Sequence, residues 1–267
     1  MFHRENAKAY LQRLSGGLVW ITKPTDPSTV QHLISVLKPC DTPHGLIRLG
    51  PAGDGGYLVP DDLDGILACV SPGVSTECGF DLAIAERGID VHMADASVEG
   101  PGVAHPRFHF EKKFLATTSG SSTTTIEKFC EAIPGFDSGG DLILQMDIEY
   151  AEYPVVLSMS PRLLSRFRII VIELHGLENM FQSFGFGIIK SFFEKLLEHH
   201  QVVHLHPNNC CGNARVSGVE VPRVLEITLH RRDRAQFTYN PTRVYPHPLD
   251  ADNVPSMPTV VLPTAWR

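Results

Sequence analysis

The sequence predicts an α/β fold built around a doubly wound, mostly parallel sheet. From residue 66 onward, strand-like and helix-like segments alternate in the order expected of such a sheet. The segment Leu142–Met146 lacks the polar–apolar alternation of a half-solvated strand, which is typical of a central strand covered on both faces. Because ligands bind beyond the carboxyl ends of the strands in such sheets, the residues after each strand are the first candidates for a site.

This pattern predicts seven strands and four helices. Strands are expected at residues 66–70, 90–94, 108–110, 141–146, 167–174, 202–206 and 221–229, with a turn-rich segment over 207–218. Helices are expected at residues 30–37, 80–87, 124–132 and 188–199. No linker divides the chain, so we expect one domain over residues 1–267, with an N-terminal helical extension (1–45) and a proline-rich C-terminal tail (240–267) that wraps the surface.

The composition is that of a soluble protein with a sizeable core, since apolar residues make up 43% of the 267 residues and charged residues 20%. The formal net charge of −7 offers no basic field for a phosphate backbone, so we expect no nucleic-acid partner. No window approaches the roughly 18 apolar residues of a spanning helix, and the first residues lack the apolar core of a secretory signal. The six cysteines fit neither a disulfide scaffold nor a zinc site, and we expect a cytoplasmic location.

A group of carboxylates directly follows the predicted central strand. Asp147, Glu149 and Glu152 fall where that strand would deliver them to the ligand-binding edge of the sheet. The alternative is that Glu149 and Glu152 open the next helix, where acidic side chains complement the helix dipole.

Two glycine-containing segments could approach a ligand closely. The loop after the first strand holds Gly73 and Gly79 at the start of a helix, and Asp95 ends the second strand, where a carboxylate can accept hydrogen bonds from a ribose diol. This combination indicates an adenosine-containing ligand, and the alternative is that Asp95 is an N-cap. Upstream, four glycines lie between Arg48 and Pro60, where a hairpin turn at 54–56 is the competing interpretation.

Four motifs together resemble the FkbM-type S-adenosylmethionine-dependent methyltransferases, over roughly residues 45 to 232. They are residues 53–59 (GDGGYLV), 71–81 (SPGVSTECGFD), 92–97 (HMADAS) and 147–152 (DIEYAE). In the family the last motif usually has glycine where this chain has Tyr150, and the first loop has Ser75 and Glu77 in place of the usual Gly-x-Gly pattern.

The resemblance implies a class I methyltransferase fold, a Rossmann-like three-layer sandwich with seven strands of which the last is antiparallel. It implies S-adenosylmethionine as cofactor and O-methylation of a small molecule, for which we expect a saccharide or glycoconjugate as partner. The residues that the resemblance places at the cofactor are Gly73, Ser75 and Glu77 at its methionine part, Asp95, Ala96 and Ser97 at its ribose and adenine, and Asp54, Gly55, Gly56 and Tyr57 folded over it.

Methyl transfer from a sulfonium is an in-line displacement that needs alignment of donor and acceptor and removal of the hydroxyl proton. Histidine has a pKa near neutrality, so the predicted catalytic residues are Asp147, His175 and His206. The predicted acceptor-binding residues are Glu149, Tyr150, His204, Asn208 and Asn209. An alternative is that Asp147, Glu173 and His175 hold a divalent cation such as Mg²⁺, which lowers the pKa of the acceptor hydroxyl.

Two other functions stay open at this point. Tyr150 and the altered first loop are compatible with a catalytically inactive nucleoside- or sugar-binding module on the same fold. An NAD-dependent enzyme ranks last, because the first strand is not followed by Gly-x-Gly-x-x-Gly.

Overall fold

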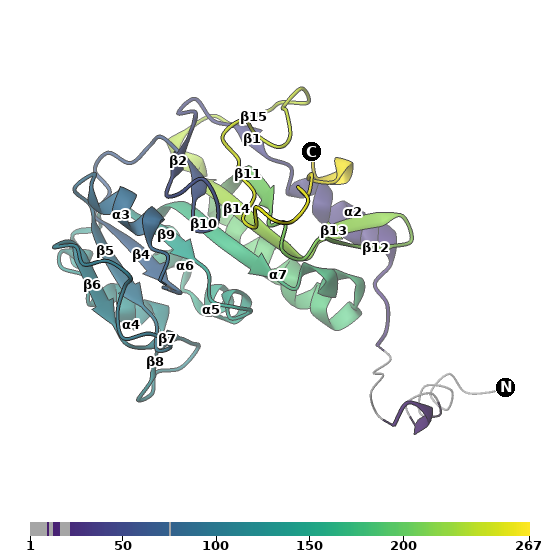
Figure 1. Cartoon of the computed structure of the whole chain (residues 1–267), viewed down its shortest axis with the longest axis horizontal. Coiled ribbons are helices and arrows are strands. Elements are labelled where there is room, and N and C mark those ends of the chain that lie inside the picture. Colours follow the sequence, from purple (N-terminus) through teal and green to yellow (C-terminus); the bar gives the residue numbers. More distant parts are fainter. Residues whose placement is uncertain (1–9, 11–12, 17–21, 75) are drawn as a thin grey trace.

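A seven-stranded mixed sheet runs through the middle of the molecule (Figure 1). The computed structural model describes residues 10, 13–16, 22–74 and 76–267. The strands lie in the spatial order β11, β14, β10, β9, β4, β5, β6. Strand β14 pairs antiparallel with both β10 and β11, whereas β10, β9, β4, β5 and β6 pair in parallel. The prediction of a mostly parallel α/β sheet is confirmed.

The observed strands follow the predicted ones closely. Their bounds are β4 (Ala68–Pro72), β5 (Asp90–Ala94), β6 (Phe108–Glu111), β9 (Leu142–Met146), β10 (Phe167–His175), β11 (His200–Pro207) and β14 (Val224–Arg231). The predicted strand over 221–229 is two strands, because a short hairpin of β12 (Asn213–Val216) and β13 (Val219–Pro222) ends at Pro222 before β14 begins. Proline has no N–H to donate to a sheet, which explains the break there.

The helices are α2 (Pro27–Val36), α3 (Gly79–Ala85), α4 (Ile126–Glu131), α5 (Glu152–Ser158), α6 (Pro161–Leu164) and α7 (Ser183–His199), with 3₁₀ turns η1 (Phe136–Ser138), η2 (Leu177–Phe181), η3 (Arg232–Arg234) and η4 (Thr264–Trp266). The helix expected at 188–199 begins five residues earlier, at Ser183. Gly185 and Gly187 weaken the helical signal of its first turn. None of the helices in the described parts of the chain is long and apolar enough to cross a membrane.

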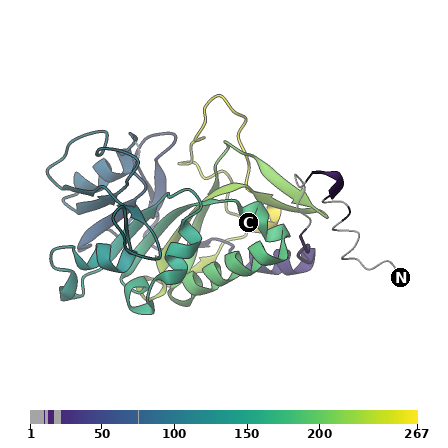
Figure 2. The same cartoon turned by 90° about the horizontal axis from the view of Figure 1, so that it is seen from below.

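The two faces of the sheet bury separate apolar cores. Helices α2, α4, α5, α6 and α7 contribute the larger core on one face, and Figure 2 shows the green and teal helices gathered along that side. The opposite face is covered by α3 and by the hairpin of β2 (Leu46–Leu49) and β3 (Tyr57–Pro60). Thr228 Oγ1 of β14 donates a 2.7 Å hydrogen bond to the carbonyl oxygen of Leu58, which fixes the hairpin against the sheet. The hairpin interpretation of residues 54–56 is therefore confirmed.

The chain after residue 240 has little regular structure and lies along the edge formed by β11 and α2. Its end packs into the larger core through Leu262 and Trp266, and η4 contacts α2 next to the C-terminus in Figure 1. Small pairings of β1 (Cys40–Asp41) with β15 (Thr238–Tyr239), and of β7 (Phe114–Leu115) with β8 (Thr123–Thr124), complete the structure. The N-terminal extension predicted for residues 1–45 lies partly outside the described residues, and the one-domain organisation stays a prediction.

Candidate functional site

A cavity of about 580 Å³ opens where the parallel strands β4, β5 and β9 end. Because these three strands are neighbours with the same direction, their carboxyl ends meet at one edge of the sheet. The cavity is lined by Gly73, Val74, Thr76, Ala94, Asp95, Ser97, Val98, Phe114, Leu115, Asp147, Ile148, Glu149 and Ala151. Its position is the one that the sequence predicts for a ligand site.

Gly73 forms part of this cavity at the exit of β4. Its φ is +88°, and a Cβ atom there would lie 1.6 Å from the carbonyl oxygen of Asp147. Only glycine fits a crossing this close, so Gly73 brings the loop after β4 against the end of β9. Ser75, which was also predicted to contact a cofactor, lies outside the described residues.

Asp95 lies at the end of β5 and is largely buried. Its Oδ1 accepts hydrogen bonds from the backbone N–H of Ser97 at 2.7 Å and from its hydroxyl at 2.6 Å. No helix lies between β5 and β6, a stretch that is fully described, so Asp95 is not a helix N-cap. The local bonds with Ser97 instead hold the carboxylate at the cavity wall.

Several cavity residues were not predicted from the sequence. Phe114 and Leu115 of β7 come after the third strand and give the cavity an apolar wall, and Thr76 and Val98 add to its lining. Ligands bind beyond the carboxyl ends of parallel strands, and this principle, which identified Asp95 after the second strand, would also have indicated Phe114 and Leu115 after the third.

A smaller cavity of about 40 Å³ adjoins the first and shares Gly73 and Asp147 with it. It also contains Asp54, Gly55, Tyr57 and Glu77, so these predicted cofactor residues do lie together beside the large cavity. Two others line neither cavity. Ala96 only follows Asp95, and Gly56 is held in the hairpin loop, where a Cβ atom would lie 2.1 Å from the carbonyl oxygen of Pro51.

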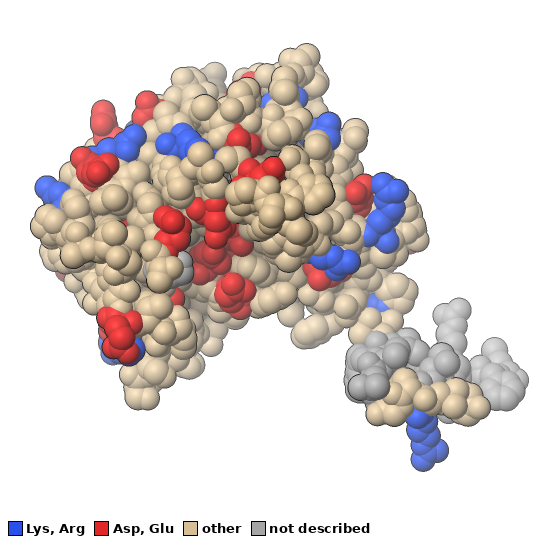
Figure 3. Space-filling model, in the orientation of Figure 1, with Lys and Arg blue, Asp and Glu red and all other residues tan. Residues whose placement is uncertain are grey.

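Four carboxylates surround His175, the last residue of β10. His175 Nδ1 lies 2.9 Å from Glu152 Oε1, while Nε2 lies 3.4 Å from Glu173 Oε1 and 3.6 Å from Glu149 Oε2. The fourth, Asp147, is 4.0 Å from Nε2. Figure 3 shows acidic side chains gathered near the middle of this face, in the region where β9 and β10 lie in Figure 1. We call these five residues the acidic cluster.

Proximity changes the protonation of the acidic cluster. Burial disfavours the charged form of His175, but Glu152 and Glu173 outweigh it and raise its pKa to about 10. Burial, followed by the charge of Glu173, raises the pKa of Asp147 to about 8. The premise that His175 titrates near neutrality is therefore wrong. At pH 7 its imidazole is protonated, so it can donate hydrogen bonds but cannot accept the hydroxyl proton.

The turn that carries the acidic cluster has a strained backbone. Glu149 and Tyr150 have φ values of +51° and +73°, in the left-handed region that non-glycine residues rarely adopt. Helix α5 begins at Glu152, as the alternative interpretation of that residue holds, yet its side chain is fully buried and bonded to His175. Glu149 lies ahead of the helix, not in its first turn, and lines the large cavity.

The polar residues at the end of β11 are engaged with the C-terminal tail. His204 Nε2 lies 2.8 Å from Asp250 Oδ1, and His206 Nδ1 lies 3.4 Å from Asp250 Oδ2. The side chain of Asn209 donates to the carbonyl oxygen of Val254 at 2.9 Å and accepts from its N–H at 2.8 Å. These three residues line neither cavity and hold the tail in place.

Asn208 differs from its neighbours because it reaches the acidic cluster. Its Nδ2 lies 3.3 Å from one carboxylate oxygen of Glu173 and 3.4 Å from the other. Asn208 therefore positions Glu173, while its own amide is used in doing so.

One group of ligand-type atoms in the acidic cluster has the spacing of a metal site. Asp147, Glu149 and His175 each offer an atom within 4.8 Å of the others. Carboxylate oxygens and an imidazole nitrogen suit a small divalent cation. Glu173, predicted as a ligand in place of Glu149, lies beside His175 but outside this group.

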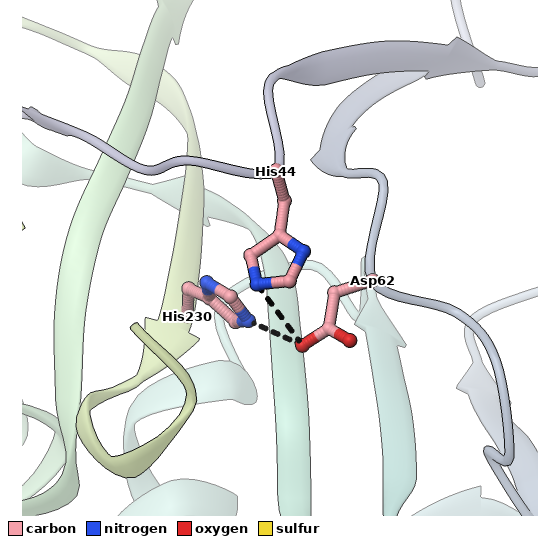
Figure 4. A group of neighbouring side chains, drawn as sticks. All are labelled: His44, Asp62 and His230. Carbon is pink, nitrogen blue, oxygen red and sulfur yellow. Dashed lines mark hydrogen bonds and ion pairs between the residues drawn. The ribbon is translucent and has the colours of Figure 1, made fainter. Parts of the chain in front are cut away.

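A second group, His44, Asp62 and His230, also has this spacing but is an ion-pair network (Figure 4). The Asp62 carboxylate is bonded to His230 at 3.0 Å and to the guanidinium groups of Arg168 and Arg234 at 3.3 and 2.8 Å. Burial opposes ionisation of Asp62, but these hydrogen bonds and charges hold its pKa at about 2. Two cations already neutralise this carboxylate, so the group joins β3 to β10 and β14 and is a poor metal site.

The comparisons with known proteins assign a family to the middle of the chain. Residues 84–201 match the family model described as the methyltransferase FkbM domain, and this range includes β5, β9, β10 and the acidic cluster. No curated protein matches the chain. Among solved structures, it is similar to the crystal structure of EvdMO1, at 12% identity and a TM-score of 0.28, over 78% of this chain and 47% of that one.

The chain thus spans about half the length of that solved structure, and a likeness this weak does not bear on function. The match over residues 84–201 stands on its own, and it agrees with the motifs at residues 92–97 and 147–152. The family-model match over residues 84–201 confirms the resemblance to FkbM methyltransferases that the sequence predicts.

Proposed function

We propose that the protein is an S-adenosylmethionine-dependent O-methyltransferase that acts on a hydroxyl group of a small molecule. The observation that carries the proposal is the cavity at the ends of β4, β5 and β9, which Asp95 lines together with Asp147 and Glu149 of the acidic cluster, in a chain that matches the FkbM domain over residues 84–201. The strand order, with antiparallel β14 between β10 and β11, supports the class I methyltransferase fold.

The residues that line the cavity fit the chemistry of the cofactor. Asp95 is placed to accept hydrogen bonds from a ribose diol, and Phe114 and Leu115 offer an apolar surface for adenine. Gly73 and Asp147 both line the smaller cavity, which we assign to the methionine part. When bound, the cofactor supplies an electrophilic methyl group on a positively charged sulfonium, which the carboxylate of Glu149 complements.

The acidic cluster supplies the remaining functions in this proposal. Protonated His175 donates a hydrogen bond that orients the acceptor oxygen, and a neighbouring carboxylate accepts the hydroxyl proton. Glu149 is the best placed of these, because it is exposed, lies 3.6 Å from His175 and lines the cavity. We keep Asp147 as a proposed catalytic residue, because it lines both the large and the smaller cavity.

The acceptor is proposed to be a saccharide or glycoconjugate, with Glu149 and Tyr150 among its contacts. We propose an indirect role for the four polar residues at the end of β11. His204, His206 and Asn209 hold the C-terminal tail, and Asn208 positions Glu173. A divalent cation at Asp147, Glu149 and His175 is the metal-dependent version of the mechanism. Turnover that is unchanged after treatment with a chelator would exclude this version.

Calorimetry with S-adenosylmethionine and S-adenosylhomocysteine tests the proposal directly. We expect both to bind, and Asp95→Ala to weaken binding by roughly tenfold or more, because a hydrogen bond to a charged group is worth about 1.5–3 kcal/mol. The exposed Asp61→Ala is the matched control and should bind like the wild type. Equal affinity of wild type and Asp95→Ala would contradict the cofactor assignment.

A methyl-transfer assay over a library of hydroxylated compounds separates the two remaining functions. Transfer to one acceptor class supports the enzyme. Cofactor binding with no transfer to any of the compounds supports the catalytically inactive nucleoside- or sugar-binding module, which the replacement of the family glycine by Tyr150 favours.

A further inference from the structure

A third cavity, of about 230 Å³, is lined by His175 and shares no lining residue with the large cavity. It is formed by the Tyr150 turn, by the end of β10, and by η2 with the first turns of α7. His175 belongs both to the lining of this cavity and to the acidic cluster, and its Nε2 is 3.6 Å from Glu149, which lines the large cavity. A compound bound in this third cavity would therefore lie next to His175, and so next to the acidic cluster.

The rim of the third cavity exposes large apolar side chains. Phe184 is 83% exposed, Tyr150 59% and Ile188 36%, and all three border the same cavity from two separate segments. Single exposed apolar residues are ordinary, but three around one hollow indicate a surface that a ligand covers.

The amide side chains of the third cavity are already bonded within the protein. Asn179 Nδ2 donates to the carbonyl oxygen of Gly176 at 2.8 Å, and its Oδ1 accepts from Gln182 Nε2 at 3.2 Å. A bare sugar, which needs partners for many hydroxyl groups, would have to displace these bonds. An apolar ring would leave them in place.

The strained backbone at Tyr150 is a second, independent observation. A non-glycine residue in the left-handed region costs about 1–2 kcal/mol, and glycine adopts the same conformation freely. Strain of this kind persists where the residue has a function. Here the Tyr150 ring lies 5.5 Å from that of His175 and rests on Gly176, where a Cβ atom would be 2.6 Å from Tyr150 Cε1. The side chain is thus held beside the acidic cluster with most of its ring exposed.

We propose that this third cavity binds a flat apolar ring of the methyl acceptor, and that Tyr150 and Phe184 determine this specificity. The inference rests on the proposed function, and it specifies the acceptor as a glycoconjugate that carries an aryl group. A cavity of roughly 150 Å³ accommodates one benzene ring, so 230 Å³ leaves room for a fused pair of rings.

Calorimetric titration of the full chain with 2-naphthol tests this assignment, with methyl β-glucopyranoside as the saccharide comparator. We expect 2-naphthol to bind more tightly than the glucoside. Tyr150→Gly and Phe184→Ala should each weaken 2-naphthol binding by roughly three- to tenfold, the range expected for loss of one aromatic contact. Tyr150→Gly also removes the strained φ, so it should fold at least as well as the wild type.

Two control variants isolate the rings from other effects. Ser217→Gly removes another positive φ, in the turn between β12 and β13, and Val244→Ala shortens another exposed apolar side chain. Both should leave 2-naphthol affinity unchanged. Unchanged affinity in Tyr150→Gly and Phe184→Ala would overturn the assignment, as would tighter binding of the glucoside than of 2-naphthol.

The outcomes also separate this inference from the proposed function. Loss of 2-naphthol affinity in the two ring variants, in a protein that does not bind S-adenosylmethionine, would leave the aromatic site standing and refute the methyltransferase proposal. Cofactor binding combined with 2-naphthol binding that ignores both variants would refute the aromatic site alone. Asp95→Ala should affect the cofactor and leave 2-naphthol affinity unchanged.

Discussion

Glu152→Gln tests the electrostatics of the acidic cluster most directly. Glu152 is fully buried, and its Oε1 lies 2.9 Å from His175 Nδ1. Two unit charges about 4 Å apart interact by about 4 kcal/mol at an effective dielectric constant of 20, which corresponds to roughly 3 pKa units. Glutamine keeps an oxygen that can accept the same hydrogen bond but removes the charge.

We therefore expect Glu152→Gln to lower the pKa of His175 from about 10 by roughly 2–3 units. The assay is an NMR titration of the histidine ring signals, with the His175 resonance assigned from a His175→Gln variant. Glu178→Gln is the matched control, because Glu178 pairs with Arg223 at 3.3 Å and is not among the carboxylates that surround His175 in the described part of the chain. A pKa of His175 near 6.5 in the wild type, or the same pKa in Glu152→Gln as in the wild type, would refute this reasoning.

Two further predictions concern stability. Gly73→Ala should destabilise the protein by about 3 kcal/mol in urea unfolding, because of the left-handed φ and the clash with the Asp147 carbonyl group. Gly139→Ala is the control, because its φ is +82° but the space around it is open, and it should lose only about 1 kcal/mol. Equal losses in the two variants would contradict the close approach of Gly73 to Asp147. The pKa of His175 is raised on folding, so its stabilising contribution is complete below pH 6.5 and is lost as the pH rises through about 10. Asp147 acts in the same direction up to about pH 8, so the free energy of unfolding should fall by about 4–5 kcal/mol between pH 7 and 9.5, and a constant value across this range would be inconsistent with the cluster.

The sheet could be predicted from the sequence because its strands carry their own signal. Leu142–Met146 and Phe167–His175 are fully buried, and fully buried strands lack polar–apolar alternation. The first turn of α7 could not be predicted, because Gly185 and Gly187 weaken the helical pattern. Its packing against α5 and η2 supplies the stability that its residue types lack.

The candidate site could be predicted where a residue follows a strand and not where its partner is distant. Asp147 and Asp95 were found from strand ends alone. The engagement of His204 by Asp250, 46 residues later, depends on the path of the C-terminal tail, which local patterns do not specify. The pKa of His175 likewise depends on Glu152, for which the sequence alone leaves two positions open, the ligand-binding edge and the next helix.

The position of β4 has a consequence for how the molecule can be divided. This strand lies between β9 and β5 in the sheet, yet it precedes residue 84, where the FkbM match begins, and β14 follows residue 201, where the match ends. A fragment cut at those bounds would lack the strand that joins β5 and β6 to the rest of the sheet, and it would expose the unpaired edges of β9 and β5. The segment that matches the family model therefore does not contain the whole sheet, and a fragment limited to it would also lack Gly73, which directly follows β4.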